Sequence, residues 1–396
     1  MAISCLLLLL SAVGVLPKPV RGARRFQVNV DPTNGTAPSE SDAEVAGTDG
    51  PPWTEPRVTE PSDVVMQPLP VVGNDPDLLP EHEGELRRWP EDLSVPHLCA
   101  PDLARYVGQA GSEQPLAGVT VILDPARGGP DHGAVWGSGA DAVMEKTIVL
   151  DIAREAEKAL MRMGASVIMT RTTDEAVSMF ASAAKAADVS LVRYIDAAQS
   201  AGYATDTIEH LRMLMGDVIR INQNSPASGG RGLFGTIGTP PQLRMIYDIE
   251  SQMTDTIFIH IALAYDGNDP SHRGSEAYYM SQSYVEDVNN GYAAGQNPLD
   301  LAPNYARIDS NGRMRLAQLL KSALATMEPE LRPEDASVPG VEKDMAVLRL
   351  NGYVGASLMP GYLSNADDRA VLASAEGRQN IGRAIANAVL QYFAAP

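Results

Sequence analysis

Basic side chains are few in this chain of 396 residues, and no run of lysine or arginine appears anywhere in it. Its 31 basic residues face 50 acidic ones, which gives a formal net charge of −19 at pH 7. Proteins that bind nucleic acid or anionic lipid surfaces depend on clustered lysine and arginine. We therefore expect neither a nucleic acid nor an anionic membrane as a partner.

Cysteine is nearly absent, because only Cys5 and Cys99 occur. Cys5 lies in an N-terminal segment that we expect to be removed, and the single thiol that then remains cannot form an intramolecular disulfide. Cysteine usage therefore gives no information about the redox compartment.

The apolar run at residues 3–16 is too short to cross a membrane, which takes about 20 residues. It has the length of the apolar part of a secretory signal peptide, and Pro17, Pro19 and a small-residue pattern at residues 20–22 follow it. Only the terminal amine supplies positive charge ahead of it. The pattern predicts a signal peptide over residues 1–23 and a secreted or periplasmic protein; an uncleaved anchor and a cytosolic protein are the alternatives.

Residues 24–79 show no sustained periodicity. Within them, residues 31–60 carry seven acidic residues, one basic residue and five prolines. Such a composition buries too little apolar surface to offset the entropy lost on ordering, so we expect a disordered tether. Residues 80–115 are expected to form a lead-in segment packed on the main domain.

Residues 116–396 carry the pattern of an α/β domain. Residues 119–123 are a β-branched run that ends at Asp-Pro, and residues 145–163 repeat apolar side chains at helical spacing before Gly164. Further strands are expected at residues 166–170, 256–260, 275–279, 346–350 and 356–359, and a closing helix at residues 377–393. This alternation predicts a single three-layer domain, with a largely parallel central sheet covered by helices on both faces.

Four short stretches lie at the ends of these elements. They read Leu-Asp-Pro-Ala-Arg-Gly-Gly at residues 123–129, Met-Glu-Lys at 144–146, Phe-Ile-His at 258–260 and Met-Pro-Gly-Tyr-Leu-Ser-Asn at 359–365. In this order they resemble the zinc-dependent N-acetylmuramoyl-L-alanine amidases, which cut the glycan–peptide bond of peptidoglycan. Two further stretches, at residues 170–174 and 273–279, also fit that family.

The resemblance implies a zinc site from which two chemical groups are missing. Glu145 and His260 stand at two of the three ligand positions, but Arg127 stands where the family has its first histidine. A guanidinium stays protonated and has no lone pair to donate, so it cannot bind zinc. Met359 stands at the position of the family's catalytic glutamate, and a thioether is no general base.

These substitutions favour an amidase-like pseudoenzyme of the cell envelope, which binds peptidoglycan or muropeptides as a binding or regulatory protein and needs no cofactor. Arg127 would then supply the charge of the lost metal and pair with Glu145, because its planar fork can hold a carboxylate bidentately. Arg273, Glu276 and Asn365, which lie in neighbouring family-like stretches, are expected in the same cleft.

An active enzyme is the main alternative. His132, five residues after Arg127, could join Glu145 and His260 in a rebuilt zinc site, with Glu276 as the nearest candidate by sequence for the missing base. A purely structural envelope protein is a third possibility. Whether the chain is an enzyme is open at this point, with inactivity favoured by the two substitutions.

Asp174 and His260 lie much further apart than the family needs, so we expect an insertion at about residues 185–254. Helices are expected in it at residues 189–198 and 206–221. Two interpretations are open: a small helical subdomain packed against the sheet edge, or a lid or docking surface over the expected active-site cleft. An envelope protein is a further candidate partner, bound through this insertion.

The composition of residues 24–79 leads to a first prediction. Limited proteolysis of the purified chain should trim this stretch and leave a stable core that begins between about residues 80 and 115, because proteases cut segments without fixed structure. Mass spectrometry of the core identifies its first residue. Protection of residues 24–79 equal to that of the core would show that the boundary is wrong.

Overall fold

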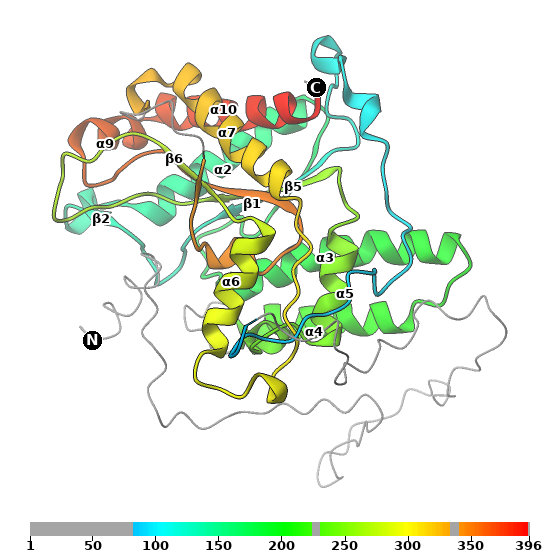
Figure 1. Cartoon of the computed structure of the whole chain (residues 1–396). Coiled ribbons are helices and arrows are strands. Elements are labelled where there is room, and N and C mark those ends of the chain that lie inside the picture. The colour runs from blue at the N-terminus through cyan, green and yellow to red at the C-terminus, as the bar shows by residue number, and fades with distance from the viewer. Residues whose placement is uncertain (1–81, 224–229, 333–339, 395–396) are drawn as a thin grey trace, which may run out of the picture. The chain divides into compact units, whose positions relative to one another are not determined.

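The computed structural model describes residues 82–394, apart from 224–229 and 333–339 (Figure 1). The expected signal peptide and tether lie outside the described residues. None of the helices in the described part is long and apolar enough to cross a membrane.

A six-stranded sheet forms the centre, in the order β4-β1-β5-β8-β6-β7. Its strands are β1 (Thr120–Pro125), β4 (Ser166–Met169), β5 (Thr256–Ile261), β6 (Glu276–Tyr279), β7 (Val341–Glu342) and β8 (Val354–Met359). The strands β4, β1, β5 and β8 are parallel, whereas β6 runs antiparallel to β8. A separate two-stranded hairpin pairs β2 (Val135–Trp136) with β3 (Val143–Met144).

Helices cover both faces of the sheet (Figure 1). The α-helices are α2 (Glu145–Arg162), α3 (Met179–Ser200), α4 (Asp206–Ile221), α5 (Pro241–Glu250), α6 (Gln282–Ala293), α7 (Ser310–Met327), α8 (Ala346–Arg349), α9 (Ala366–Ala373) and α10 (Ala375–Ala394). The expected fold class, a largely parallel sheet between helical layers, is therefore confirmed.

The alternation of side chains along the strands divides the apolar interior in two. Val121 and Leu123 of β1 pack with α2, α7 and α10, while Ile122 between them packs with α3, α4 and α5 on the opposite face. Both faces of β1 are thus covered, which explains why its sequence is an unbroken apolar run.

Three of the expected elements differ in the structure. Residues 346–350, expected as a strand, form the short helix α8, and the strand expected at 356–359 begins earlier, as β8 at Val354. A short apolar run does not by itself distinguish a strand from a buried helical turn. In the insertion, α4 has the expected bounds, whereas α3 begins at Met179, ahead of the expected helix at 189–198.

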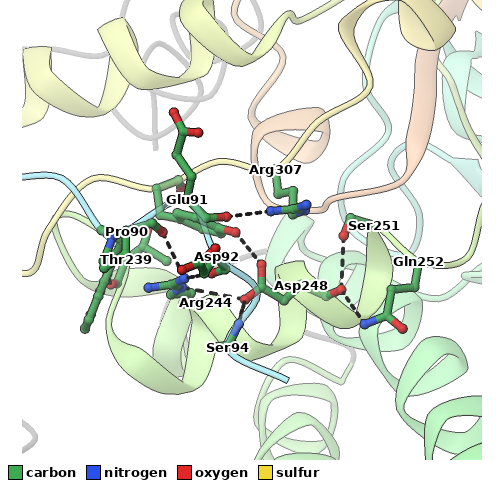
Figure 2. Close-up of polar contacts among 12 residues, drawn as sticks. Pro90, Glu91, Asp92, Ser94, Thr239, Arg244, Asp248, Ser251, Gln252 and Arg307 are labelled. Carbon is green, nitrogen blue, oxygen red and sulfur yellow. Dashed lines mark hydrogen bonds and ion pairs between the residues drawn. The ribbon is translucent and has the colours of Figure 1, made fainter. Parts of the chain in front are cut away.

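Residues 90–94 lie against α5 and are held there by polar contacts with its side chains (Figure 2). Asp248 of α5 is fully buried and accepts hydrogen bonds from the backbone N–H and hydroxyl of Ser94, both at 2.6 Å, and from the Tyr305 hydroxyl. The Arg244 guanidinium donates to the carbonyls of Pro90 and Asp92 and lies 3.6 Å from the Asp248 carboxylate.

This network predicts that Asp248→Ala lowers the free energy of unfolding by about 3 kcal/mol, because removing one partner leaves the buried Arg244 charge uncompensated. Asp217→Ala is the matched control, since Asp217 forms an exposed ion pair with Arg220 on α4 and its loss should change stability by less than about 0.5 kcal/mol. Urea unfolding followed by circular dichroism measures both. Equal effects of the two variants would contradict the role given to Asp248.

Candidate functional site

The family-like stretches meet at the carboxyl ends of three neighbouring strands. Asp124 of β1 pairs in register with His260 of β5, which pairs in turn with Ser357 of β8. Partners in register project from the same face of a sheet, so the three side chains form a row. The hydroxyl of Ser357 is buried and finds no hydrogen-bond partner within the described residues.

His260 is oriented by a buried carboxylate that we did not predict from the sequence. Its Nδ1 lies 2.6 Å from Asp124 Oδ2, while Asp124 Oδ1 accepts from the hydroxyls of Thr170 and Ser182. Burial raises the pKa of a carboxyl, but the hydrogen bonds from His260, Thr170 and Ser182 outweigh it and hold the pKa of Asp124 below its usual value.

An ionised carboxylate can only accept hydrogen bonds, so Nδ1 of His260 carries the proton of this contact. In a neutral imidazole the lone pair then lies on the other ring nitrogen, Nε2. Side chains that bind metals are often oriented in this way by a carboxylate. The first sign of this partner in the sequence was the aspartate that ends the β1 run, directly before Pro125.

Glu145 lies in the first turn of α2 with a side chain that is only 1% exposed. Its Oε1 accepts from the backbone N–H of Leu263 at 3.0 Å, and its Oε2 accepts from that of Ala134 at 2.8 Å. Both oxygens are therefore engaged by the loops that follow β5 and β1.

Arg127 forms the expected ion pair with Glu145, through Nε at 3.4 Å from Oε2. The expected bidentate geometry is wrong, because Nη1 instead points to Asp131 Oδ2, also at 3.4 Å, and Nε has no aligned hydrogen-bond acceptor. Burial lowers the pKa of a guanidinium, but the charges of Glu145 and Asp131 outweigh burial and raise the pKa of Arg127. Arg127, which the resemblance aligns with a metal ligand, is therefore a fixed cation.

The backbone at Arg127 is unusual. Among the described residues it is the one non-glycine residue with a left-handed conformation, at φ 67°. Gly133 closes over the pair, since a Cβ there would stand 2.2 Å from Glu145 Oε2 and 2.8 Å from Cγ of Arg127. The loop is thus shaped tightly around this ion pair.

A second set of contacts fixes the same loop, which follows β1. Lys146 donates to the carbonyl of Gly129 and to Asp174, each at 2.7 Å, and Asp174 also accepts from the N–H of Gly129. Arg171 is buried and donates to the carbonyls of Pro125, Ala126 and Lys146. The family-like stretch at residues 170–174 therefore acts as a clamp on the loop.

Met359 is buried at the end of β8 in a small apolar cluster with Ala262, Ala264 and Tyr278. Glu276, which we considered as a replacement base, pairs with Met359 across the antiparallel strands. The hydroxyls of Tyr278 and Tyr362 each donate to one of its oxygens. Burial, together with this carboxylate, raises the pKa of both tyrosines, so the phenols remain protonated donors.

Arg273 and Asn365 stabilise the loops around the site. Arg273 pairs with Asp367 at 3.0 Å, and Asn365 caps α9 by accepting from the backbone N–H groups of Asp367 and Asp368. Asn365 also donates to the carbonyl of Pro270. Both side chains are occupied by these structural contacts.

These residues do not fit a zinc site. Glu145 already accepts two backbone hydrogen bonds beside a guanidinium, and the side chain of His132 is exposed. In the part of the chain that the structure describes, no three or more His, Cys, Asp or Glu side chains are grouped as a metal would require. The positive charge of Arg127, which lies beside Glu145, would also repel a divalent ion.

The ion pair predicts that Arg127→Ala lowers the free energy of unfolding by about 1–3 kcal/mol, because the buried Glu145 charge loses its counter-charge. The double variant with Glu145→Gln should recover only part of this loss, because an amide replaces one oxygen that accepts a backbone N–H. Arg220→Ala, at an exposed ion pair on α4, is the control. Thermal and urea unfolding give the values; an unchanged stability of Arg127→Ala would refute the interpretation.

The comparisons with known proteins point to one family. Residues 121–196 match the family model described as N-acetylmuramoyl-L-alanine amidase. The probable cell wall amidase LytH of Staphylococcus epidermidis is 36% identical over 97 residues, which are 24% of this chain and 30% of that protein. The germination-specific N-acetylmuramoyl-L-alanine amidase of Bacillus subtilis is 45% identical over 60 residues, 15% of this chain and 24% of that protein.

The chain thus spans less than a third of the length of these two relatives. Among solved structures, the N-acetylmuramoyl-L-alanine amidase AmiC2 of Nostoc punctiforme is 18% identical with a TM-score of 0.39, covering 70% of this chain and 98% of that one. Ami1 of Mycobacterium smegmatis is 16% identical with a TM-score of 0.41, at 70% and 98% coverage. Residues 121–196, which the family model matches, are therefore similar in sequence to the N-acetylmuramoyl-L-alanine amidases.

Proposed function

We propose that this chain is a secreted protein of the cell envelope that binds peptidoglycan in an amidase-like cleft without hydrolysing it. The observation that supports this most is the Arg127–Glu145 ion pair at the position of a metal ligand. Peptidoglycan is the substrate class that the resemblance to the amidases implies, and the proposed lack of hydrolysis follows from Arg127 and Met359 in this chain.

Hydrolysis of an amide needs an activated water and a base that takes its proton. Arg127 can supply neither, because its pKa is raised above an already high value. Met359 lies in an apolar cluster, and Glu276, on the adjacent strand β6, accepts hydrogen bonds from the hydroxyls of Tyr278 and Tyr362. The groups at the candidate site thus suit binding better than proton transfer.

Binding, unlike hydrolysis, needs only hydrogen-bonding groups and charges at suitable positions. His260 Nε2 makes no hydrogen bond to any other residue that the structure describes, so it can accept one from an amide or a hydroxyl of the ligand. The side chain of Arg127 is about a quarter exposed, and its positive charge is proposed to attract a stem-peptide carboxylate. These two groups are proposed to orient the glycan–peptide junction.

A zinc amidase with a rebuilt site is the second candidate. The Asp124–His260 contact favours it, because it leaves Nε2 of His260 free as a ligand. It would require Glu145 to give up a backbone hydrogen bond, and the loop carrying His132 to turn inward.

The helices of the insertion at about residues 185–254 are proposed as the surface for any envelope partner.

The proposal predicts that the full chain, purified at neutral pH, contains far less than one zinc per molecule and releases no soluble fragments from murein sacculi, yet sediments with them. Elemental analysis, dye release from labelled sacculi and co-sedimentation measure the three properties.

Arg127→His should raise the zinc content, because it restores a neutral lone pair at the third position, and it should not restore turnover while Met359 remains. One zinc per chain that disappears in His132→Ala would favour the rebuilt site instead. Turnover of sacculi by the unmodified chain would refute the pseudoenzyme, and failure to sediment with them would refute the binding function.

A further inference from the structure

Trp136 stands out among the tryptophans of the described region. Its side chain is 43% exposed, on the hairpin of β2 and β3. Trp89, by contrast, is buried and donates its indole N–H to the carbonyl of Thr239. The indole N–H of Trp136 makes no hydrogen bond to any residue that the structure describes, and the residue is partly exposed to solvent.

The hairpin is fixed to the candidate site at its base. The backbone N–H of Ala134, two residues before Trp136, donates to Glu145 Oε2, and the N–H of Glu145 donates to the carbonyl of Ala134. Two residues of chain span at most about 7 Å. Trp136 therefore lies beside the site that holds Glu145.

The Trp136 ring also packs against an arginine side chain. The guanidinium carbon of Arg369, on α9, lies 3.7 Å from the centroid of the Trp136 ring. Arg369 in turn donates to the carbonyls of Leu363, Ser364 and Asn365, in the family-like turn after β8. One face of the indole thus rests on a cation that is itself held by three backbone acceptors.

We propose that Trp136 is a stacking platform for a sugar ring of the glycan strand, with Arg369 as its positioning residue. The inference rests on the proposed binding of peptidoglycan and names the part of that ligand which this rim of the site contacts. A pyranose presents an apolar face of C–H groups surrounded by hydroxyls, which matches an exposed indole with an unused N–H beside it. Because the platform is held before binding, little ordering is needed on contact.

The surroundings favour a sugar over a protein partner. Val135 is the neighbouring exposed apolar side chain, and Gly137, Ser138 and Gly139 follow Trp136. A stable protein interface buries roughly 800 Å² on each side around an apolar centre, which this narrow hairpin does not offer. The net charge of −19 disfavours a nucleic-acid base as the stacked group.

The test uses the full chain labelled with ¹⁵N. Its three tryptophans give three indole N–H signals, and the one lost in Trp136→Phe belongs to Trp136. The β-1,4-linked tetramer of N-acetylglucosamine should shift this signal, and a free stem peptide should leave it in place. Trp136→Ala should weaken binding to murein sacculi at least about tenfold, in line with the loss of a stacked ring.

Matched variants separate the platform from general damage. Trp136→Phe should keep binding within about threefold of the unmodified chain, and Met213→Ala, which removes an exposed apolar side chain on α4, should leave it unchanged. Arg369→Met should weaken binding, and Arg369→Lys should restore part of it, if the cation positions the ring. Melting temperatures of all variants confirm that they fold.

Three outcomes overturn the inference. If sacculi bind Trp136→Ala as tightly as the unmodified chain, the platform is wrong and the peptidoglycan-binding function stands. If the stem peptide or another envelope protein, and not the tetramer, moves the Trp136 signal, the ligand is not a glycan. If the unmodified chain fails to bind sacculi, the proposed function falls together with the platform.

Discussion

The buried carboxylate of Glu145 is the group around which the loops of the site are arranged. One negative charge, almost fully removed from solvent, is shared between the N–H of Leu263, the N–H of Ala134 and the guanidinium of Arg127. Such a charge is tolerated only when hydrogen bonds and a counter-charge replace its hydration. The loops after β1 and β5 are therefore fixed to the first turn of α2 by the same two oxygens.

This arrangement explains how the loops around Glu145 keep their shape with an arginine at position 127, where the resemblance to the amidases places a metal ligand. In the resemblance to the amidases, a divalent ion would balance Glu145; here a permanent cation does so from a left-handed backbone position. The clamp of Lys146, Asp174 and Arg171 holds the same loop independently of the pair. The geometry that places His260 and Asp124 thus depends on backbone contacts that do not involve a metal.

Much of the fold could be predicted from the sequence, because strand and helix periodicities are local. The run before Asp124 and the bounds of α4 are examples. The Arg127–Glu145 pair was also within reach, since burying a carboxylate without a partner is costly. Its one-point geometry was not, because it depends on Asp131, which draws Nη1 away.

The remaining errors share one physical origin. The helix at Ala346–Arg349 depends on what the surrounding chain packs against it, and periodicity over so few residues carries no such information. The partner of His260 lies 136 residues away in the chain and becomes its neighbour only through the register of β1 and β5. Contacts of this kind arise from the sheet, and no local pattern records them.

Helix α3 connects the candidate site at Asp124 to helix α4. Its first turn contains Ser182, whose hydroxyl donates to Asp124 at 2.7 Å, and its far end leads into α4, which packs along it. A helix of 22 residues is about 33 Å long and bends little, so it acts as a stiff lever between them. A force on α4 that tilts α3 would displace the Ser182 hydroxyl that donates to Asp124. Because Asp124 orients His260, the ring of His260 would then turn.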